Sequence, residues 1–239
     1  MIARHWRGWC WKRPAKVSEV DLWAVVPVKE RVSAKERLAP MLRPETRQAL
    51  ALAMLQDVLA AVAATPGIAG LAVVTVDAEA GRLAASYGGR VVEAGARDGH
   101  TGAVTAAARL LAAEGCTGMI TLPGDIPLVT PAEIESLLTA HLPAPSFTIV
   151  PSHDERGSNA IACSPPDGVP LRFGDNSFYP HLRTAEAYGI QPNVLHLPGI
   201  ALDIDNPEDV VSFMRTQSAT QAWAVLSEER MPLVGGFRR

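Results

Sequence analysis

Short, almost uninterrupted apolar runs alternate along this chain with segments whose apolar residues recur at the helical period. The runs at 22–28, 71–76 and 119–122 show little polar alternation, which is typical of strands buried on both faces of a parallel sheet. Residues 44–64 instead place leucine or valine every three or four positions, and this spacing predicts a helix. Strands and helices that follow one another in this way predict βαβ units.

The alternation continues toward the carboxyl end. Thr130 and Glu133 fit a capping box, and Pro131 suits a first helical turn. Asn206 is expected to cap a further helix. We therefore predict an α/β fold built on a mostly parallel, doubly wound sheet. The other elements expected are helices at 78–87, 100–113 and 178–188, and strands at 90–93, 147–151, 160–163 and 194–197.

The domain organisation is expected to be simple. The chain has 239 residues, of which 48% are hydrophobic, and this is enough for one well-buried core. No repeat or long linker divides it, so we expect a single domain over residues 21–217. Residues 1–20, rich in tryptophan and basic side chains, are expected to be a disordered leader, with a surface-binding or dimerising arm as the alternative. Residues 218–239 are expected to be a C-terminal tail.

The composition favours a cytoplasmic protein with small-molecule partners. A net charge of -3 provides no strong field for nucleic acid or an anionic membrane. No run of about 18 apolar residues is present, and the leader lacks the apolar stretch of a secretory signal. Cys10, Cys116 and Cys163 are far apart, which argues against a disulfide framework or a zinc site and favours a reducing compartment. Nothing in the sequence indicates an oligomeric state.

Acidic residues follow two of the expected strands. Asp125 comes soon after the buried run 119–122, in a turn that also contains Gly124 and Pro127. Ligands of open α/β sheets bind beyond the carboxyl ends of the strands, so Asp125 is a candidate metal ligand and catalytic carboxylate. The alternative is a turn aspartate that caps backbone amides.

Asp203 and Asp205 are two positions apart. In an extended segment their carboxylates share one face, while Leu202 and Ile204 point to the other. Two adjacent like charges repel unless a cation lies between them, and hard oxygen ligands suit Mg²⁺. Asp205 could merely help to cap the next helix, but that alternative does not explain Asp203. Together with Asp125, these residues predict a site for one or two Mg²⁺ ions.

The loop after the first strand is basic. Residues 29–37 contain four lysines or arginines, and at a strand's carboxyl end they form a credible phosphate clamp. Lys29 is the strongest candidate because it adjoins the strand, and Lys35 is a second. A solvated charged loop is the alternative, since two glutamates lie among the cations. The spacing is not that of a Walker loop.

Three polar, glycine-containing stretches are further candidates. Glycine lets backbone amides approach an anion, which favours a binding role for 156–160 and 172–178, although ordinary turns have the same composition. The stretch 98–103 opens a helix of small residues, and small side chains there would leave room for a flat base.

Taken together, these segments resemble the 2-phospho-L-lactate guanylyltransferase family of deazaflavin coenzyme F-420 biosynthesis. Bacterial members of that family use phosphoenolpyruvate or 3-phospho-D-glycerate instead. The match covers roughly residues 22–212, and its pieces stand in the family's order. They are VPVKERVSAKERL at 26–38, LPGDIPL at 122–128, GSNAI at 157–161, FGDNSF at 173–178 and DIDNPED at 203–209.

The resemblance implies a nucleotide-diphospho-sugar-transferase-like fold and transfer of GMP from GTP to a small phosphorylated acid, with release of pyrophosphate. It implies Mg²⁺ bound by Asp125, Asp203 and Asp205, with the acid bound by Lys29, Ser158, Gly174 and Ser177. The family more often has threonine at the position of Ser158. Its base-contact stretch usually resembles G-L-N-x-A, and the corresponding residues here are Gly99, His100, Thr101 and Ala103. This departure weakens the expectation of guanine.

Two other functions stay open. The nearer is a different nucleotidyltransferase of the same fold, acting on molybdenum cofactor or a sugar phosphate. The other is a non-catalytic nucleotide-binding module, which would tolerate loss of the aspartates. In the enzyme, the acid's phosphate is already ionised at neutral pH, so no general base is required. The sequence does not distinguish phosphoenolpyruvate, 3-phospho-D-glycerate and 2-phospho-L-lactate as acceptors.

Overall fold

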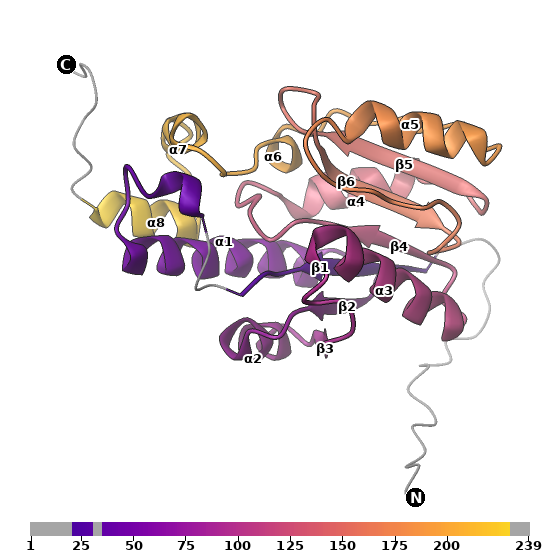
Figure 1. Cartoon of the computed structure of the whole chain (residues 1–239), viewed down its shortest axis with the longest axis horizontal. Coiled ribbons are helices and arrows are strands. Elements are labelled where there is room, and N and C mark those ends of the chain that lie inside the picture. The colour runs from indigo at the N-terminus through magenta and orange to yellow at the C-terminus, as the bar shows by residue number, and fades with distance from the viewer. Residues whose placement is uncertain (1–20, 31–34, 230–239) are drawn as a thin grey trace, which may run out of the picture.

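A computed structural model describes residues 21–30 and 35–229 (Figure 1). Its centre is a seven-stranded sheet in the order β3-β2-β1-β4-β6-β5-β7. Neighbouring strands are parallel except at β6, which runs antiparallel to both β4 and β5. The predicted α/β, mostly parallel sheet is therefore confirmed. The strands are β1 (Leu22–Pro27), β2 (Ile68–Val74), β3 (Arg90–Val92), β4 (Gly118–Thr121), β5 (Ser146–Pro151), β6 (Ser158–Ser164) and β7 (Asn193–Val194).

Helices cover both faces of the sheet (Figure 1). On one face, α1, α2, α4 and α6 pack on the strands, and on the other face α3 and α5 do. Successive residues of β1 serve the two layers in turn: Ala24 and Val26 belong to the first core, and Val25 to the second. The helices are η2 (Glu36–Leu38), α1 (Pro44–Ala64), α2 (Ala78–Ser86), α3 (Gly99–Ala113), α4 (Pro131–Ala140), α5 (Phe178–Ala187), α6 (Pro198–Ala201), α7 (Pro207–Met214) and α8 (Gln221–Glu228).

The sheet has a switch point between β1 and β4. These two parallel strands are neighbours, and the chain extends from them in opposite directions, to β2 and β3 on one side and to β6, β5 and β7 on the other. Ligands of doubly wound sheets bind beyond the carboxyl ends of the strands at such a point. The loops that follow β1 and β4 carry Lys29, Lys35 and Asp125, so the topology itself brings these candidates together.

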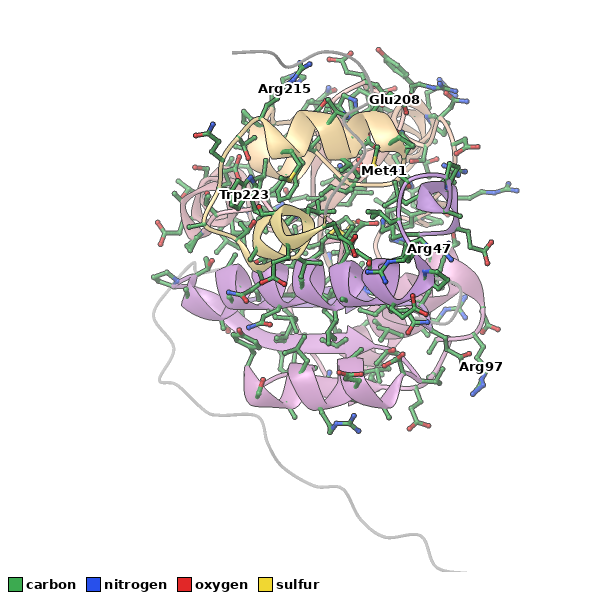
Figure 2. All side chains as sticks on the ribbon, turned by 90° about the vertical axis from the view of Figure 1, so that its left-hand side faces the viewer. Met41, Arg47, Arg97, Glu208, Arg215 and Trp223 are labelled. Carbon is green, nitrogen blue, oxygen red and sulfur yellow. The ribbon has the colours of Figure 1, made fainter. Side chains whose placement is uncertain are left out.

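The C-terminal part of the fold extends further than the sequence indicated. The expected tail from 218 contains α8, which lies between α1 and α7 (Figure 2). The carboxylate of Asp57 on α1 accepts hydrogen bonds from the backbone N–H groups of Gln221 and Ala222. Ala222 and Leu226 are fully buried. The packed part of the chain thus continues beyond the expected boundary at 217, because α8 completes a third apolar cluster on α1. The expected leader, 1–20, lies outside the described residues.

Two local predictions can be compared directly with the structure. Asn206 caps α7 and forms a capping box with Asp209, and the capping box of Thr130 and Glu133 is likewise present. The strand expected at 194–197 ends at Val194, because Pro198 opens the short helix α6. Among the described residues, α1 alone is long and apolar enough to cross a membrane, and its buried side chains pack in the protein core.

Candidate active site

The two acidic loops are joined at the backbone. The N–H of Ile204 donates a 3.0 Å hydrogen bond to the carbonyl oxygen of Asp125. Ile204 is itself fully buried, in the cluster formed by α1, α7 and α8. Because side chains alternate along an extended segment, Asp203 and Asp205 point away from that cluster. This is the arrangement that the D-x-D spacing predicted.

Lys35 lies between two of the three carboxylates. Its Nζ is 2.6 Å from Oδ2 of Asp125 and 2.7 Å from Oδ1 of Asp205, and only 10% of its side chain is exposed. Burial alone would lower the pKa of Lys35, but the charges of Asp125 and Asp205 outweigh it and raise the pKa above its usual range. Burial would raise the pKa of Asp205, and attraction to Lys35 lowers it overall. Asp205 is therefore an ion-pair partner, while Asn206 performs the capping.

The backbone shape of the basic loop explains how Lys35 reaches this position. Lys35 precedes η2 in the left-handed conformation, with φ 53° and ψ 43°. Such a conformation is uncommon outside glycine and turns the chain sharply. Its carbonyl accepts a hydrogen bond from the N–H of Leu38, which is fully buried against α1. Residues 31–34 of the same loop lie outside the described part of the chain.

Asp203 has a different partner, which the sequence did not single out. The amide nitrogen of Asn159 donates to Oδ1 of Asp203 and to the carbonyl oxygens of Ile200 and Ala201, each at 3.0 Å. Burial, aided by the nearby charge of Asp125, raises the pKa of Asp203 to about 6. Lys35 thus bridges two of the three carboxylates, and the third, Asp203, accepts a hydrogen bond from Asn159.

A β-bulge positions both Asn159 and its neighbour. In the β5–β6 ladder Val150 pairs with Ala160 and Pro151 pairs with Ser158, so Asn159 is the extra residue on β6. An extra residue reverses the alternation of side chains beyond it. Ser158 consequently faces α5, and Asn159 faces α6 and Asp203. One irregularity therefore supplies a residue to each half of the candidate site.

The two predicted acid-binding serines meet on the α5 side. Oγ of Ser177 lies 3.4 Å from Oγ of Ser158, and Oγ of Ser158 is 2.9 Å from Nδ1 of His181. Ser177 precedes α5, and both serines are buried. Gly174 stands earlier in the same loop with φ +152°, a backbone conformation that favours glycine. The structure thus brings Ser158 and Ser177 together, beside the exposed loop residue Gly174.

The expected base-binding stretch at the start of α3 contacts this acid-side loop. Oγ1 of Thr101 accepts a 3.0 Å hydrogen bond from the backbone N–H of Phe173, so that oxygen is engaged within the protein. The ring of His100 lies 4.3 Å from that of Phe173, centroid to centroid. Burial lowers the pKa of His100 to about 4; the charge of Asp125 opposes this and that of Lys29 adds to it. His100 is therefore neutral near pH 7.

A small pocket connects the first strand to α3. Lys29, Gly99, His100 and Ala103 line it together with Pro27, Val28 and Ala96. Lys29 is exposed at its edge. Three of the four residues expected at the base therefore share a pocket with Lys29, which the resemblance assigns to the phosphorylated acid.

Two of the three predicted magnesium ligands converge on one cation. Among the side chains in the described ranges, no three of histidine, cysteine, aspartate or glutamate converge closely enough to hold a metal together. Asp125 and Asp205 do converge on one positive charge, the ammonium of Lys35. Mg²⁺ is typically bound by one or two carboxylates, with substrate phosphates and water completing its shell. The pair therefore suits Mg²⁺ if Lys35 moves to a phosphate, with Asp203 as a neighbouring carboxylate.

Comparison with known proteins decides the family. The family model described as "Guanylyl transferase CofC like" matches residues 22–232. The chain belongs to this family. A phosphoenolpyruvate guanylyltransferase of Conexibacter woesei is 35% identical over 192 residues, which is 80% of this chain and 86% of that protein. A 3-phospho-D-glycerate guanylyltransferase of Colwellia psychrerythraea is 34% identical over 186 residues, 78% of this chain and 88% of that one.

Solved structures show the same fold at lower identity. A protein of Desulfovibrio desulfuricans assigned as a nucleotide-diphospho-sugar transferase superposes with a TM-score of 0.68 at 17% identity, covering 87% of this chain and 94% of that one. A CMP:2-keto-3-deoxy-manno-octonic acid synthetase complexed with CTP gives 0.54 at 15% identity, covering 83% and 100%. The predicted nucleotide-diphospho-sugar-transferase-like fold is thus confirmed, and this guanylyl transferase family member is a nucleotidyltransferase.

Proposed function

We propose that this chain transfers GMP from GTP to a small phosphorylated acid and releases pyrophosphate, as a step of deazaflavin coenzyme F-420 biosynthesis. The acceptor is phosphoenolpyruvate, 3-phospho-D-glycerate or 2-phospho-L-lactate. The observation that carries the proposal is the cluster at the switch point, in which Lys35 lies between Asp125 and Asp205 with Asp203 beside them. The names of the relatives at 34–35% identity support the choice of donor and acceptor.

The two halves of the site suit the two substrates. Lys29, which the family resemblance assigns to the acid, and Lys35 place cationic groups at the carboxyl end of β1, where phosphate groups of the two substrates would meet. Asp125 and Asp205, with Asp203, would hold Mg²⁺, which when bound neutralises charge on the triphosphate. On the other side of the bulge, Ser158 and Ser177 offer hydroxyl groups near the exposed backbone of Gly174. Hydroxyls and amides bind a carboxylate or phosphate without adding net charge.

In-line attack by the acid needs orientation more than proton transfer. Its phosphate oxygen is ionised at neutral pH and attacks the α-phosphorus of GTP, from which pyrophosphate departs. No side chain has to remove a proton. His181 is consistent with this because both of its ring nitrogens are engaged within the protein, and the ring of His100 lies tilted against that of Phe173. The catalytic contribution of the chain is charge compensation by Lys29 and by the carboxylates that would hold Mg²⁺, Asp125 among them, together with alignment of the acid.

A competition experiment tests the proposal. The protein is incubated with GTP, Mg²⁺ and an equal mixture of the three acids, and the products are identified by mass spectrometry. The expected result is one dominant GMP–acid conjugate and an equal amount of pyrophosphate. A parallel reaction with CTP in place of GTP should yield far less. Absence of any nucleotide–acid conjugate, or release of pyrophosphate that does not depend on acid, would refute the proposed function.

A further inference from the structure

His181 links the two acid-side loops although it was not expected in the site. It lies on α5 and is 1% exposed. Its Nδ1 is 2.9 Å from Oγ of Ser158, and its Nε2 accepts a 3.0 Å hydrogen bond from the backbone N–H of Arg172. The ring therefore joins the start of β6 to the loop that carries Gly174 and Ser177.

The backbone contact determines which ring nitrogen carries the proton. An N–H group can only donate, so Nε2 must be the unprotonated nitrogen of the ring. Burial, with the nearby His100, lowers the pKa of His181 to about 4, so the ring is neutral at pH 7 and has one N–H. That N–H is consequently on Nδ1, and it donates to the hydroxyl oxygen of Ser158.

These contacts leave the proton of the Ser158 hydroxyl available for donation to another group. Its oxygen accepts from Nδ1 of His181, and at the longer distance of 3.4 Å it accepts from the hydroxyl of Ser177. Neither contact uses the hydroxyl proton of Ser158. A hydroxyl that accepts hydrogen bonds is polarised and becomes a better donor. Ser158 keeps 9% of its surface exposed, whereas His181 keeps 1%, so of the two residues the serine retains more surface toward the loop.

We infer that His181 is a positioning residue, which fixes its Nδ1–H tautomer through Arg172 and thereby directs the Ser158 hydroxyl proton toward an anionic oxygen of the acid acceptor. The inference rests on the proposed function, because it assumes that an anionic acid binds beside Ser158. It assigns no chemical step to the imidazole. The effect is expected on acceptor affinity, because Ser158 is the group through which His181 acts.

Two substitutions separate the contacts of the ring. The side-chain amide nitrogen of asparagine falls near the position of Nδ1, so His181→Asn keeps a donor to Ser158 and loses the Arg172 contact. The amide of glutamine falls near Nε2, so His181→Gln keeps a partner for Arg172 and loses the donor. A neutral hydrogen bond contributes about 0.5–1.5 kcal/mol, or roughly 2- to 13-fold. His181→Gln should raise the KM for the acid by this factor, and His181→Asn by less, with the KM for GTP unchanged in both.

The Ser158→Ala background distinguishes positioning from general packing. If His181 acts through the serine, His181→Gln should add no further increase in the acid KM once Ser158 is alanine. An equal increase in both backgrounds would mean that the ring acts elsewhere and would overturn the inference. Wild-type protein that converts none of the three acids would instead refute the proposed function, before any variant is compared.

A measurement on the unaltered protein covers the case in which the variants do not fold. The ring nitrogens of ¹⁵N-histidine-labelled protein report the tautomer through their chemical shifts, with the His181 signal assigned by comparison with either variant or by sequential assignment. The expected result at pH 7 is a neutral ring protonated at Nδ1. A ring protonated at Nε2, or at both nitrogens, would overturn the inference.

Discussion

Replacing Lys35 by methionine tests the charge balance at the switch point. Methionine has a similar length and can stay buried, but it leaves Asp125 and Asp205 without the ammonium that lies 2.6 and 2.7 Å from them. Breaking a fully buried ion pair costs roughly 3–5 kcal/mol. The carboxylate partners are 27% and 44% exposed, so solvent reduces that cost. We expect the free energy of unfolding without Mg²⁺ to fall by about 1–3 kcal/mol.

Mg²⁺ should stabilise Lys35→Met more than it stabilises the wild type. If Mg²⁺ binds the two carboxylates of the wild type, it must first displace the ammonium of Lys35, whereas in Lys35→Met the carboxylates are already free. A ligand at a hundredfold excess over its Kd stabilises the folded state by about 2.7 kcal/mol, and a tenfold change in Kd alters this by about 1.4 kcal/mol. The stabilisation by Mg²⁺ should therefore be larger in Lys35→Met by about 1 kcal/mol or more, although turnover is lost.

The assay is urea unfolding in EDTA and in millimolar MgCl₂ at fixed ionic strength. Lys29→Met is the matched control, because it removes the same charge from the same edge of the sheet, where Lys29 is exposed. It should lower the stability in EDTA much less than Lys35→Met does. The reasoning is refuted if Mg²⁺ stabilises the wild type and Lys35→Met equally, because Lys35 would then not occupy the cation position.

Three further substitutions, at Asp203, Ser177 and His141, test other parts of the account. Asp203→Asn should fold normally and lose nearly all turnover, as measured by circular dichroism and pyrophosphate release; near-normal turnover with unchanged Mg²⁺ dependence would contradict a metal role. Ser177→Ala should raise the KM for the acid by about 10- to 150-fold, as expected if the Ser177 hydroxyl leaves its 3.4 Å contact with Ser158 and donates to the charged acid, and should leave the KM for GTP almost unchanged; the reverse pattern would mean that the substrate halves are exchanged. His141, buried between Thr148 and Ser164, has its pKa lowered by burial from 6.5 to about 4. Because the folded state favours the neutral ring, the contribution of His141 to the free energy of unfolding is complete above pH 6.5 and falls by up to about 3 kcal/mol as the pH drops to 4. Urea unfolding across this range should show a smaller decline of that free energy in His141→Gln than in the wild type. Equal declines in the two proteins would exclude His141 as the cause.

The sequence predicts what local patterns determine. Buried apolar runs identify β1, β2 and β4, because only strands covered on both faces lack polar alternation. The D-x-D spacing places Asp203 and Asp205 on one side because Ile204 is apolar and must be buried. These inferences need no knowledge of distant contacts, and the structure agrees with them.

The contacts that we did not predict from the sequence depend on tertiary geometry. Asn159 reaches Asp203 only because a bulge in β6 reverses the side-chain alternation. His181 stands on a helix face that resembles any amphipathic helix, and its partners are distant in sequence. The left-handed conformation of Lys35 has no signature in its neighbours. The helix α8 is short, and its place in the fold depends on the apolar surface of α1 against which it packs.

The most direct test of the central claim follows the label from GTP. Two reactions are run with the preferred acid, one with [α-³²P]GTP and one with [γ-³²P]GTP, and the products are separated by chromatography. The account predicts that the α label appears in the GMP–acid conjugate and the γ label in pyrophosphate. Transfer of the γ label to the acid, or its release as inorganic phosphate with no labelled conjugate from the α reaction, would contradict guanylyl transfer.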